Sequence, residues 1–332
     1  MRRTAVVGGL VLVATVVAGI LYVRSSVLSP VTRRAAERVV VIPPGSGALQ
    51  IGQALEAAGM VRRASDFVYA ARLRGVTRSL RGGEYVLAPS MPLLAIVDKI
   101  ARGDVLLHAV TIPEGYTAEQ IVQVLAAKRL GDAARLRALV RRGASEFPFA
   151  FLRTVPDDSL EGYLFPDTYR LPRFLDEHAV IAAFLERFDD VVVPLWRREG
   201  GDRSLHEIVT MASMVEREAR LGTERPLIAG VLTNRLRRGW RLEVDATVLY
   251  ALGHHTPVVT YDDLKVNSPY NTYLHAGLPP GPIANPGLAA IQAALHPAQT
   301  DYLYYVARPD GSHAFSRTLT EHLAAVRRYQ RP

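Results

Sequence analysis

The amino-acid sequence predicts an α+β protein with a single N-terminal transmembrane helix, a small α+β module and a larger mixed α+β domain. The helix is indicated by an uncharged apolar run over residues 5–23. The module is indicated by short strand and helix patterns over 39–108. The domain is indicated by longer helical patterns, proline-rich loops and a terminal hairpin over 109–332. Residues 1–4 and 24–38 are then a tail and a juxtamembrane connector.

The composition indicates a folded chain and excludes several partner classes. The 332 residues are 49% hydrophobic, with a mean hydropathy of +0.09, which excludes global disorder. The formal charge of +8 suits an anionic partner. No basic block, zinc-finger spacing or aromatic RNA-binding run is present, so no nucleic-acid partner is expected. Cysteine is absent, which excludes disulfides and thiolate chemistry.

The N-terminal apolar run has the length of a membrane span. As a helix, residues 5–23 would extend about 28 Å, close to the roughly 30 Å of a bilayer's hydrocarbon core. Arg2 and Arg3 precede the run, and after Arg24 no charge follows until Arg33. This asymmetry places the N-terminus in the cytoplasm and the rest of the chain outside it. A cleaved signal peptide is the alternative interpretation.

The module over 39–108 is predicted from alternating short elements. Strand patterns cover 38–42, 82–87 and 106–112, and helical patterns cover 48–55, 65–73 and 91–101, most of them ending at glycine. A further helix is expected over 117–130. The module contains no cluster of residues typical of catalysis, so we expect it to be a spacer or a substrate-docking module.

The region over 109–180 is mainly helical and is interrupted at 160–169. There Glu161, Phe165 and Asp167 crowd with tyrosines around a glycine and a proline. Pro166 removes a backbone donor and restricts Phe165, so this stretch is not one regular element. Binding residues often lie on such irregular backbone. A turn whose rings fill the core is the alternative.

A helix over 205–221 is the element around which the remaining sequence is organised. Ser204 and Glu207 form a capping-box pattern, and apolar residues recur at helical spacing. At about 100° per residue, and with Ile208 at zero, Glu218 points to about 280°, within the apolar sector, and Glu216 to about 80°, at its edge. A buried carboxylate must be paired or have a raised pKa. In the alternative, both glutamates are solvated and pair with the neighbouring arginines 217 and 220.

The C-terminal part combines loops, a hairpin and helices. A helix is expected over 227–237, and a strand or loop over 240–247 presents Asp245. Two irregular segments follow. One carries Tyr270, Asn271 and Tyr273, and the other, 277–287, includes Pro280 among four prolines and three glycines. A long rigid loop is usually functional. Strands over 302–307 and 313–316 flank a turn, and Thr318 with Glu321 caps a closing helix.

Catalysis by carboxylate side chains is the one class of reaction that the motifs of this sequence do not exclude. The sequence has no nucleophile elbow, no phosphate-binding loop and no metal-ligand spacing, so neither a metal nor a cofactor is expected. Glu216 or Glu218 remains, with Asp245, Glu161 and Asp167 as partners. Carboxylates among tyrosines and asparagines indicate cleavage of a glycosidic bond, for which the general acid needs a raised pKa.

Four motifs in order resemble the YceG-like endolytic murein transglycosylases, and the resemblance covers the chain from the apolar run to the C-terminus. The matching segments are 212–218 (ASMVERE), 161–169 (EGYLFPDTY), 270–273 (YNTY) with 277–283 (GLPPGPI), and 310–316 (DGSHAFS) with 321–322 (EH). The resemblance implies a single-pass anchor in the bacterial inner membrane with a cytoplasmic tail over 1–4. It also implies a LysM-like module over 39–108 and a catalytic domain over 109–332 outside the cytoplasm.

The resemblance further implies an activity and its partners. The expected reaction is cleavage of MurNAc-β-1,4-GlcNAc bonds within nascent peptidoglycan strands, leaving 1,6-anhydro-MurNAc ends. The partners would be glycan strands, the membrane and peptidoglycan synthases. A hydrolytic muramidase that uses Asp245 as a second carboxylate, and a non-catalytic glycan-binding scaffold, are the alternatives.

The resemblance places the catalytic glutamate in the helix that carries Glu216 and Glu218, and the position of Glu218 in the apolar sector assigns the role to it, with Glu216 as the alternative. Tyr270, Asn271 and Tyr273 are expected to hold the sugar. Glu161, Asp167 and Asp245 are expected to orient loops or to polarise the acid. Phe165, Pro280 and His313 are further candidates for substrate binding.

Overall fold

The computed structural model describes residues 2–22, 24, 29–253 and 259–329. The chain divides into two compact units. The first comprises Met1–His108 with Arg170–Leu175, and the second comprises Ala109–Tyr169 with Asp176–Pro332. The described residues form a mixed α+β fold with small antiparallel sheets, as the sequence predicts.

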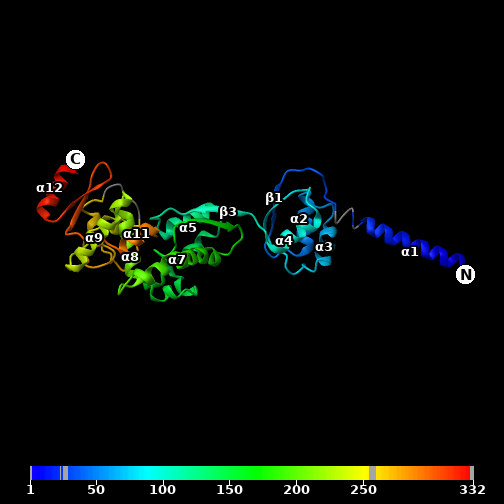
Figure 1. Ribbon diagram of the computed structural model, residues 1–332, viewed down its shortest axis with the longest axis horizontal. Helices are drawn as coiled ribbons and strands as arrows, with labels where there is room; N and C mark the ends of the chain where they lie inside the picture. The colour runs from blue at the N-terminus through cyan, green and yellow to red at the C-terminus, as the bar shows by residue number, and fades with distance from the viewer. Residues whose placement is uncertain (1, 23, 25–28, 254–258, 330–332) are drawn as a thin grey trace. The chain divides into compact units, whose positions relative to one another are not determined.

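The first unit is built on an antiparallel strand pair covered by helices (Figure 1). Its elements are α1 (Arg2–Tyr22), β1 (Arg38–Ile42), α2 (Ala48–Ala57), α3 (Ala64–Leu73), β2 (Gly83–Leu87) and α4 (Leu93–Arg102). Val40 and Ile42 of β1 are buried whereas Val39 and Val41 are exposed, the period-two pattern of a strand with one face on a core. Tyr85 of β2 lies opposite Val40 and is fully buried.

The N-terminal helix α1 contains most of the predicted anchor over residues 5–23. Across the residues that the structure describes, no helix combines the length and the apolarity that crossing a membrane requires.

The second unit consists mainly of helices. They are α5 (Ala118–Ala127), α6 (Ala133–Arg142), α7 (Glu177–Glu199), α8 (Leu205–Glu218), α9 (Arg225–Arg237), α10 (Asp245–Leu252), α11 (Leu288–Leu295) and α12 (Leu319–Tyr329). Strands β5 (Tyr304–Ala307) and β6 (His313–Ser316) form the predicted hairpin, with Tyr305 opposite Phe315. Strand β3 (Leu107–Thr111) pairs with β4 (Thr168–Pro172).

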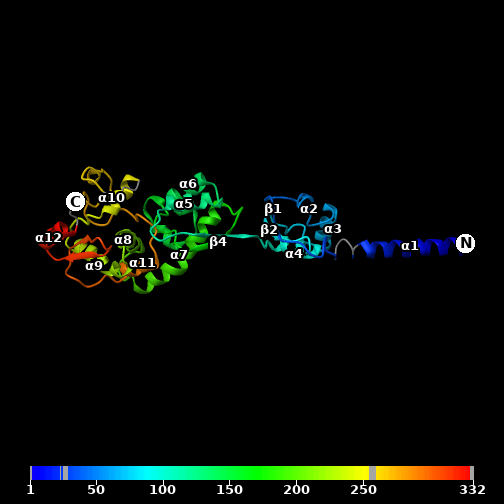
Figure 2. The same cartoon turned by 90° about the horizontal axis from the view of Figure 1, so that it is seen from above.

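Helix α8 lies at the centre of the second unit, with α9, α10 and α11 packed around it (Figure 2). The predicted capping box is present: Glu207 N–H donates to the Ser204 hydroxyl, and the Glu207 carboxylate accepts from Ser204 N–H at 2.8 Å. The helix ends at Glu218 and not at residue 221, because Ala219 is extended (φ −75°, ψ 112°). Glu218 is therefore the last helical residue.

The proline-rich loop over 277–287 is irregular, as predicted, and is bound to the core. Ile283 N–H donates to the Ser213 hydroxyl of α8 at 3.0 Å. The side chain of Asn285 accepts from Leu164 N–H at 2.9 Å and donates to Tyr116 O at 2.9 Å. This loop thus joins α8 to the segment around residue 162.

Gly162 provides a test of this packing. Its φ is +89°, and an added Cβ would lie 2.5 Å from Pro282 and 2.9 Å from Val209. Gly162→Ala should therefore lose about 3 kcal/mol of unfolding free energy, the sum of left-handed strain and overpacking. Gly239→Ala is the control, because Gly239 has φ +68° with no neighbouring atom, and should lose only about 1 kcal/mol. Urea unfolding followed by tryptophan fluorescence reports on this unit, since both tryptophans lie in it. Equal losses would show that the contact with Pro282 is unimportant.

Candidate active site

Glu218 lies in the wall of a cavity of about 390 Å³, which we call the acid cavity. The cavity forms where the C-terminus of α8 meets the start of α10 and the β5–β6 hairpin. Its polar and aromatic lining consists of Glu218, Arg235, Glu243, Asp245, Tyr273, Tyr304, Tyr305, His313 and His322.

The surroundings of Glu218 favour its protonated form near neutral pH. Burial, with a smaller contribution from the nearby Asp245 carboxylate, raises the pKa of Glu218 to about 7. The Tyr305 hydroxyl donates to Glu218 Oε2 at 3.0 Å, and Ala246 N–H also donates to the carboxylate; both bonds lower the pKa and limit the shift. A carboxyl group in this state can donate a proton at pH 7 and accept one back.

Asp245 lines the acid cavity together with Glu218. It is the first residue of α10, and not part of the strand or loop that the sequence predicts. The Tyr273 hydroxyl donates to Asp245 Oδ1 at 2.5 Å. Two of the predicted site residues, Asp245 and Tyr273, thus meet Glu218 in one cavity.

Glu216 lies away from the acid cavity in an ion pair. Arg225 Nη2 is 2.8 Å from Glu216 Oε1, and Gly287 N–H donates to Oε2 at 3.1 Å. The Glu216 side chain is 7% exposed, so these bonds replace water. The alternative in which both glutamates are solvated and pair with Arg217 and Arg220 is therefore wrong. The geometry favours Glu218 as the acid, and Glu216 stabilises the last turn of α8.

His313 is another predicted residue that lines the acid cavity, after Asp245 and Tyr273. Its Nδ1 lies 2.7 Å from Glu224 Oε2, and its backbone N–H donates to Glu224 Oε1 at 3.0 Å. The ring packs edge-on against Tyr305, with 5.5 Å between the centroids. His313 therefore supports the tyrosine that binds Glu218.

Glu161 lies elsewhere, in the lining of a second cavity of about 460 Å³. Burial raises the pKa of Glu161 to about 8, although hydrogen bonds from Ala118 N–H, at 2.9 Å, and from Tyr250 limit the shift. Tyr270 does not line this cavity; its ring packs on Tyr250, with 4.9 Å between the centroids.

Besides Tyr270, four predicted binding residues line neither cavity. Phe165 is 6% exposed, and Asp167 pairs with Arg187 at 2.7 Å. Asn271 is fully buried, and its amide donates to the carbonyl groups of Leu264 and Val266, both at 2.9 Å. Pro280 O accepts from His206 Nε2 at 2.8 Å. For Asn271 the expectation of a sugar contact does not fit, because its polar atoms serve the loop itself.

Tyr305 and Arg235 also line the acid cavity, although the sequence motifs did not predict them as site residues. Tyr305 lies in the predicted hairpin, and the register places it on the same face as His313. Arg235 follows Ile228, Val231 and Leu232 at helical spacing, so it occupies a core position of α9. Its guanidinium donates to Leu303 O at 2.9 Å and pairs with Glu243 at 2.9 Å. Both residues could have been found by placing polar side chains on the predicted faces.

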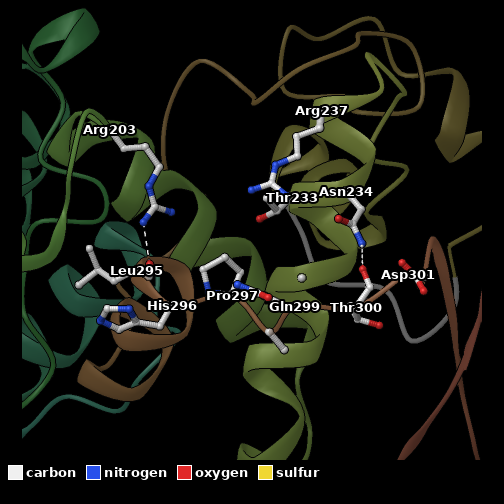
Figure 3. A pocket seen from close by; sticks show the side chains of 12 residues that line it. Arg203, Thr233, Asn234, Arg237, Leu295, His296, Pro297, Gln299, Thr300 and Asp301 are labelled. Atoms are coloured by element: carbon white, nitrogen blue, oxygen red, sulfur yellow. Dashed lines mark hydrogen bonds between the residues drawn. The ribbon is translucent and has the colours of Figure 1, made fainter.

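A third and larger cavity, of about 960 Å³, lies between α9 and the segment after α11 (Figure 3). Its polar side chains mainly bind backbone. Arg203 donates to the carbonyl groups of Ala294 and Leu295, and Asn234 donates to Thr300 O at 2.6 Å. The Arg203 bonds hold the last turn of α11, and the Asn234 bond attaches the segment after α11 to α9.

Within the ranges that the structure describes, no group of three histidine, aspartate or glutamate residues is arranged to hold a metal ion. In the acid cavity, the raised pKa of Glu218 allows it to protonate a leaving group, while tyrosine hydroxyls and Arg235 can orient polar ligand groups.

The raised pKa of Glu218 gives stability a specific pH dependence. The folded pKa, about 7, exceeds the ordinary 4.5, so the stability due to protonated Glu218 is complete below pH 4.5 and is lost as pH rises through 7. The unfolding free energy of Glu218→Gln, relative to the wild type, should therefore increase between pH 5 and 8. Glu207→Gln is the control. Hydrogen bonds from Ser204 lower the pKa of Glu207, so the difference in unfolding free energy between this variant and the wild type should stay constant from pH 5 to 8. A constant difference for Glu218→Gln would contradict the raised pKa.

Comparison with known proteins places this geometry in a family. A profile of the YceG-like family matches residues 40–328. The chain is 34% identical over 331 residues to the endolytic murein transglycosylase of Bacillus subtilis strain 168, covering 95% of this chain and 91% of that protein. It is 32% identical over 319 residues to the endolytic murein transglycosylase of Streptococcus pneumoniae strain D39, covering 87% of this chain and 57% of that protein.

A solved structure agrees with the match. A yceG-like protein of Listeria monocytogenes is 35% identical, with a TM-score of 0.61, and the alignment covers 88% of this chain and 100% of that chain. The family resemblance inferred from the four motifs is thus confirmed, and the chain belongs to the YceG-like family.

Proposed function

We propose that the protein is an endolytic lytic transglycosylase. It cleaves MurNAc-β-1,4-GlcNAc bonds within peptidoglycan strands and leaves 1,6-anhydro-MurNAc ends. The observation that carries the proposal is the position of the partly buried Glu218 carboxyl in a cavity lined by tyrosines, where desolvation raises its pKa to about 7. The relatives named endolytic murein transglycosylase support the substrate class.

The proposed mechanism needs one acid that acts twice. Protonated Glu218 donates its proton to the glycosidic oxygen, and the bond from that oxygen to C1 of MurNAc breaks. The C6 hydroxyl of the same sugar then forms a bond to C1 and returns its proton to the Glu218 carboxylate. The attacking hydroxyl is already attached to the sugar, so proximity lowers the barrier and no enzyme nucleophile is required.

The Tyr305 hydroxyl and Ala246 N–H limit the basicity of the carboxylate between the two proton transfers. Both bonds stabilise the charged form, which exists after the first transfer. Asp245 has the opposite effect, because its charge favours reprotonation of Glu218. Together, these opposing effects keep the pKa of Glu218 close to neutral pH.

A hydrolytic muramidase is the second candidate, and Asp245 is the observation that favours it. A second carboxylate in the same cavity could activate a water molecule. The Tyr273 hydroxyl, 2.5 Å from Asp245 Oδ1, already occupies one of its oxygens. The products decide between the two, because hydrolysis leaves a reducing end one water heavier than the anhydro end. A non-catalytic glycan-binding scaffold would give neither product.

Replacing Glu218 tests the assignment directly. Glu218→Gln should abolish anhydro product, a loss of at least about 100-fold, because the amide cannot donate the proton. Glu216→Gln is the matched control two residues away; it breaks the Arg225 pair, so it should lower stability but retain anhydro product. The assay is mass analysis of fragments released from uncrosslinked glycan. Full activity of Glu218→Gln, with loss in Glu216→Gln, would reverse the assignment.

The location is proposed from the sequence. Peptidoglycan lies outside the cytoplasm, so the proposal places residues 109–332 there, at the bacterial cytoplasmic membrane beside peptidoglycan synthases. The uncharged run over 5–23 and the preceding Arg2 and Arg3 support this orientation. We further propose that residues 39–108 form a LysM-like module. Mass spectrometry of the chain from cell membranes should find residues 5–23 retained, and loss of the first two dozen residues would contradict attachment through them.

A further inference from the structure

The second cavity, of about 460 Å³, is not used by the proposed mechanism. It lies at the start of α5, beside α6 and α10, and Glu161 forms part of its floor. Its polar lining consists of Thr117, Glu119, Gln120, Gln123, Arg141, Ser159, Glu161, Arg217 and Tyr250.

The second cavity adjoins the acid cavity through two pairs of consecutive residues. Arg217 lines the second cavity and Glu218 the acid cavity; Ala246 lines the second cavity and Asp245 the acid cavity. Consecutive Cα atoms are about 3.8 Å apart, so both cavities border the same junction between α8 and α10. A glycan strand that passes over this junction would meet both cavities.

Glu161 supports this cavity and is not free to bind a ligand. Its oxygens accept from Ala118 N–H at 2.9 and 3.1 Å and from Asn285 Nδ2 at 3.0 Å, and Tyr250 also donates to it. These bonds occupy the acceptor sites of the carboxyl and fix α5 against α10. A ligand would instead meet the surrounding amides, the tyrosine ring and the arginines.

Arg141 is the cation best placed to bind such a ligand. Its nearest carboxylate, that of Glu119, is 3.6 Å away, and its side chain is 68% exposed. Glu119 is bound more closely by Arg137, through bonds of 2.7, 2.9 and 3.0 Å. Arg141 thus keeps donors in a planar fork that suits a carboxylate. The amides of Gln120 and Gln123 and the ring of Tyr250 are suited to a sugar.

We infer that the second cavity is a saccharide subsite next to the cleavage position, in which Arg141 binds a carboxylate carried by a muramyl residue. The carboxylate belongs to the lactyl group in glycan without peptides, and to the stem peptide in glycan that bears them. This inference rests on the proposed function for its substrate class, and it assigns a recognition role to residues outside the acid cavity.

Binding measured without turnover tests the inference. The full chain carrying Glu218→Gln is titrated calorimetrically with three tetrasaccharides: chitotetraose, a GlcNAc–MurNAc oligomer without peptides, and the same oligomer with stem peptides. Adding Arg141→Gln should raise Kd about tenfold for the carboxylate-bearing oligomers, equivalent to about 1.4 kcal/mol, and leave chitotetraose unchanged. Arg142→Gln is the matched control, since the adjacent Arg142 is exposed and does not line the cavity.

The outcomes separate this inference from the proposed function. A tenfold effect on the peptide-free oligomer identifies the lactyl carboxylate, and an effect only on the peptide-bearing oligomer identifies the peptide. The inference is overturned if Arg141→Gln binds both muramyl oligomers as tightly as its parent, or if the parent binds neither. Production of anhydro ends by the wild type is measured separately. If that activity is absent while Arg141→Gln still weakens binding, the proposed function fails and the subsite stands.

Discussion

The burial of the Glu218 carboxyl at the end of α8 is the constraint on which the second unit depends. Placing an ionised carboxylate in a protein interior is unfavourable, and the C-terminal end of a helix adds negative potential. Tyr305 and Ala246 N–H offset part of this penalty through hydrogen bonds. Because these hydrogen bonds offset only part of the cost of ionisation, Glu218 stays partly protonated near pH 7, as a general acid must.

Glu218 stays in this unfavourable environment because contacts around the last turn of α8 hold that turn in place. Glu216 binds Arg225 and Gly287 N–H, so the residue two positions before the acid anchors the backbone. The proline-rich loop binds α8 through Ser213, and α9 and α11 cover its other faces. The two glutamates therefore have separate tasks, one in packing and one in chemistry, and strain at the acid is compensated by contacts around it.

Local patterns predicted much of this arrangement. Helical spacing placed Glu218 in the apolar sector, the capping residues gave the start of α8, and the turn signal gave the hairpin. Contacts between segments that are far apart in the sequence could not be predicted from local patterns. No local signal links Tyr305 to Glu218, and Asn271, which was expected to hold sugar, is buried because its amide closes its own loop. Asp245 was assigned to a strand or loop because α10, eight residues long, is too short for a clear periodicity.

The most direct test is a titration of Glu218 itself. Carbon-13 NMR of the glutamate side-chain carboxyl groups, recorded from pH 4 to 9 on the wild type and on Glu218→Gln, identifies the Glu218 signal as the one that the variant lacks. We expect a midpoint of about 7 for that signal. A midpoint near the ordinary 4.5 would show that the cavity leaves Glu218 fully ionised at neutral pH and would contradict its assignment as the acid.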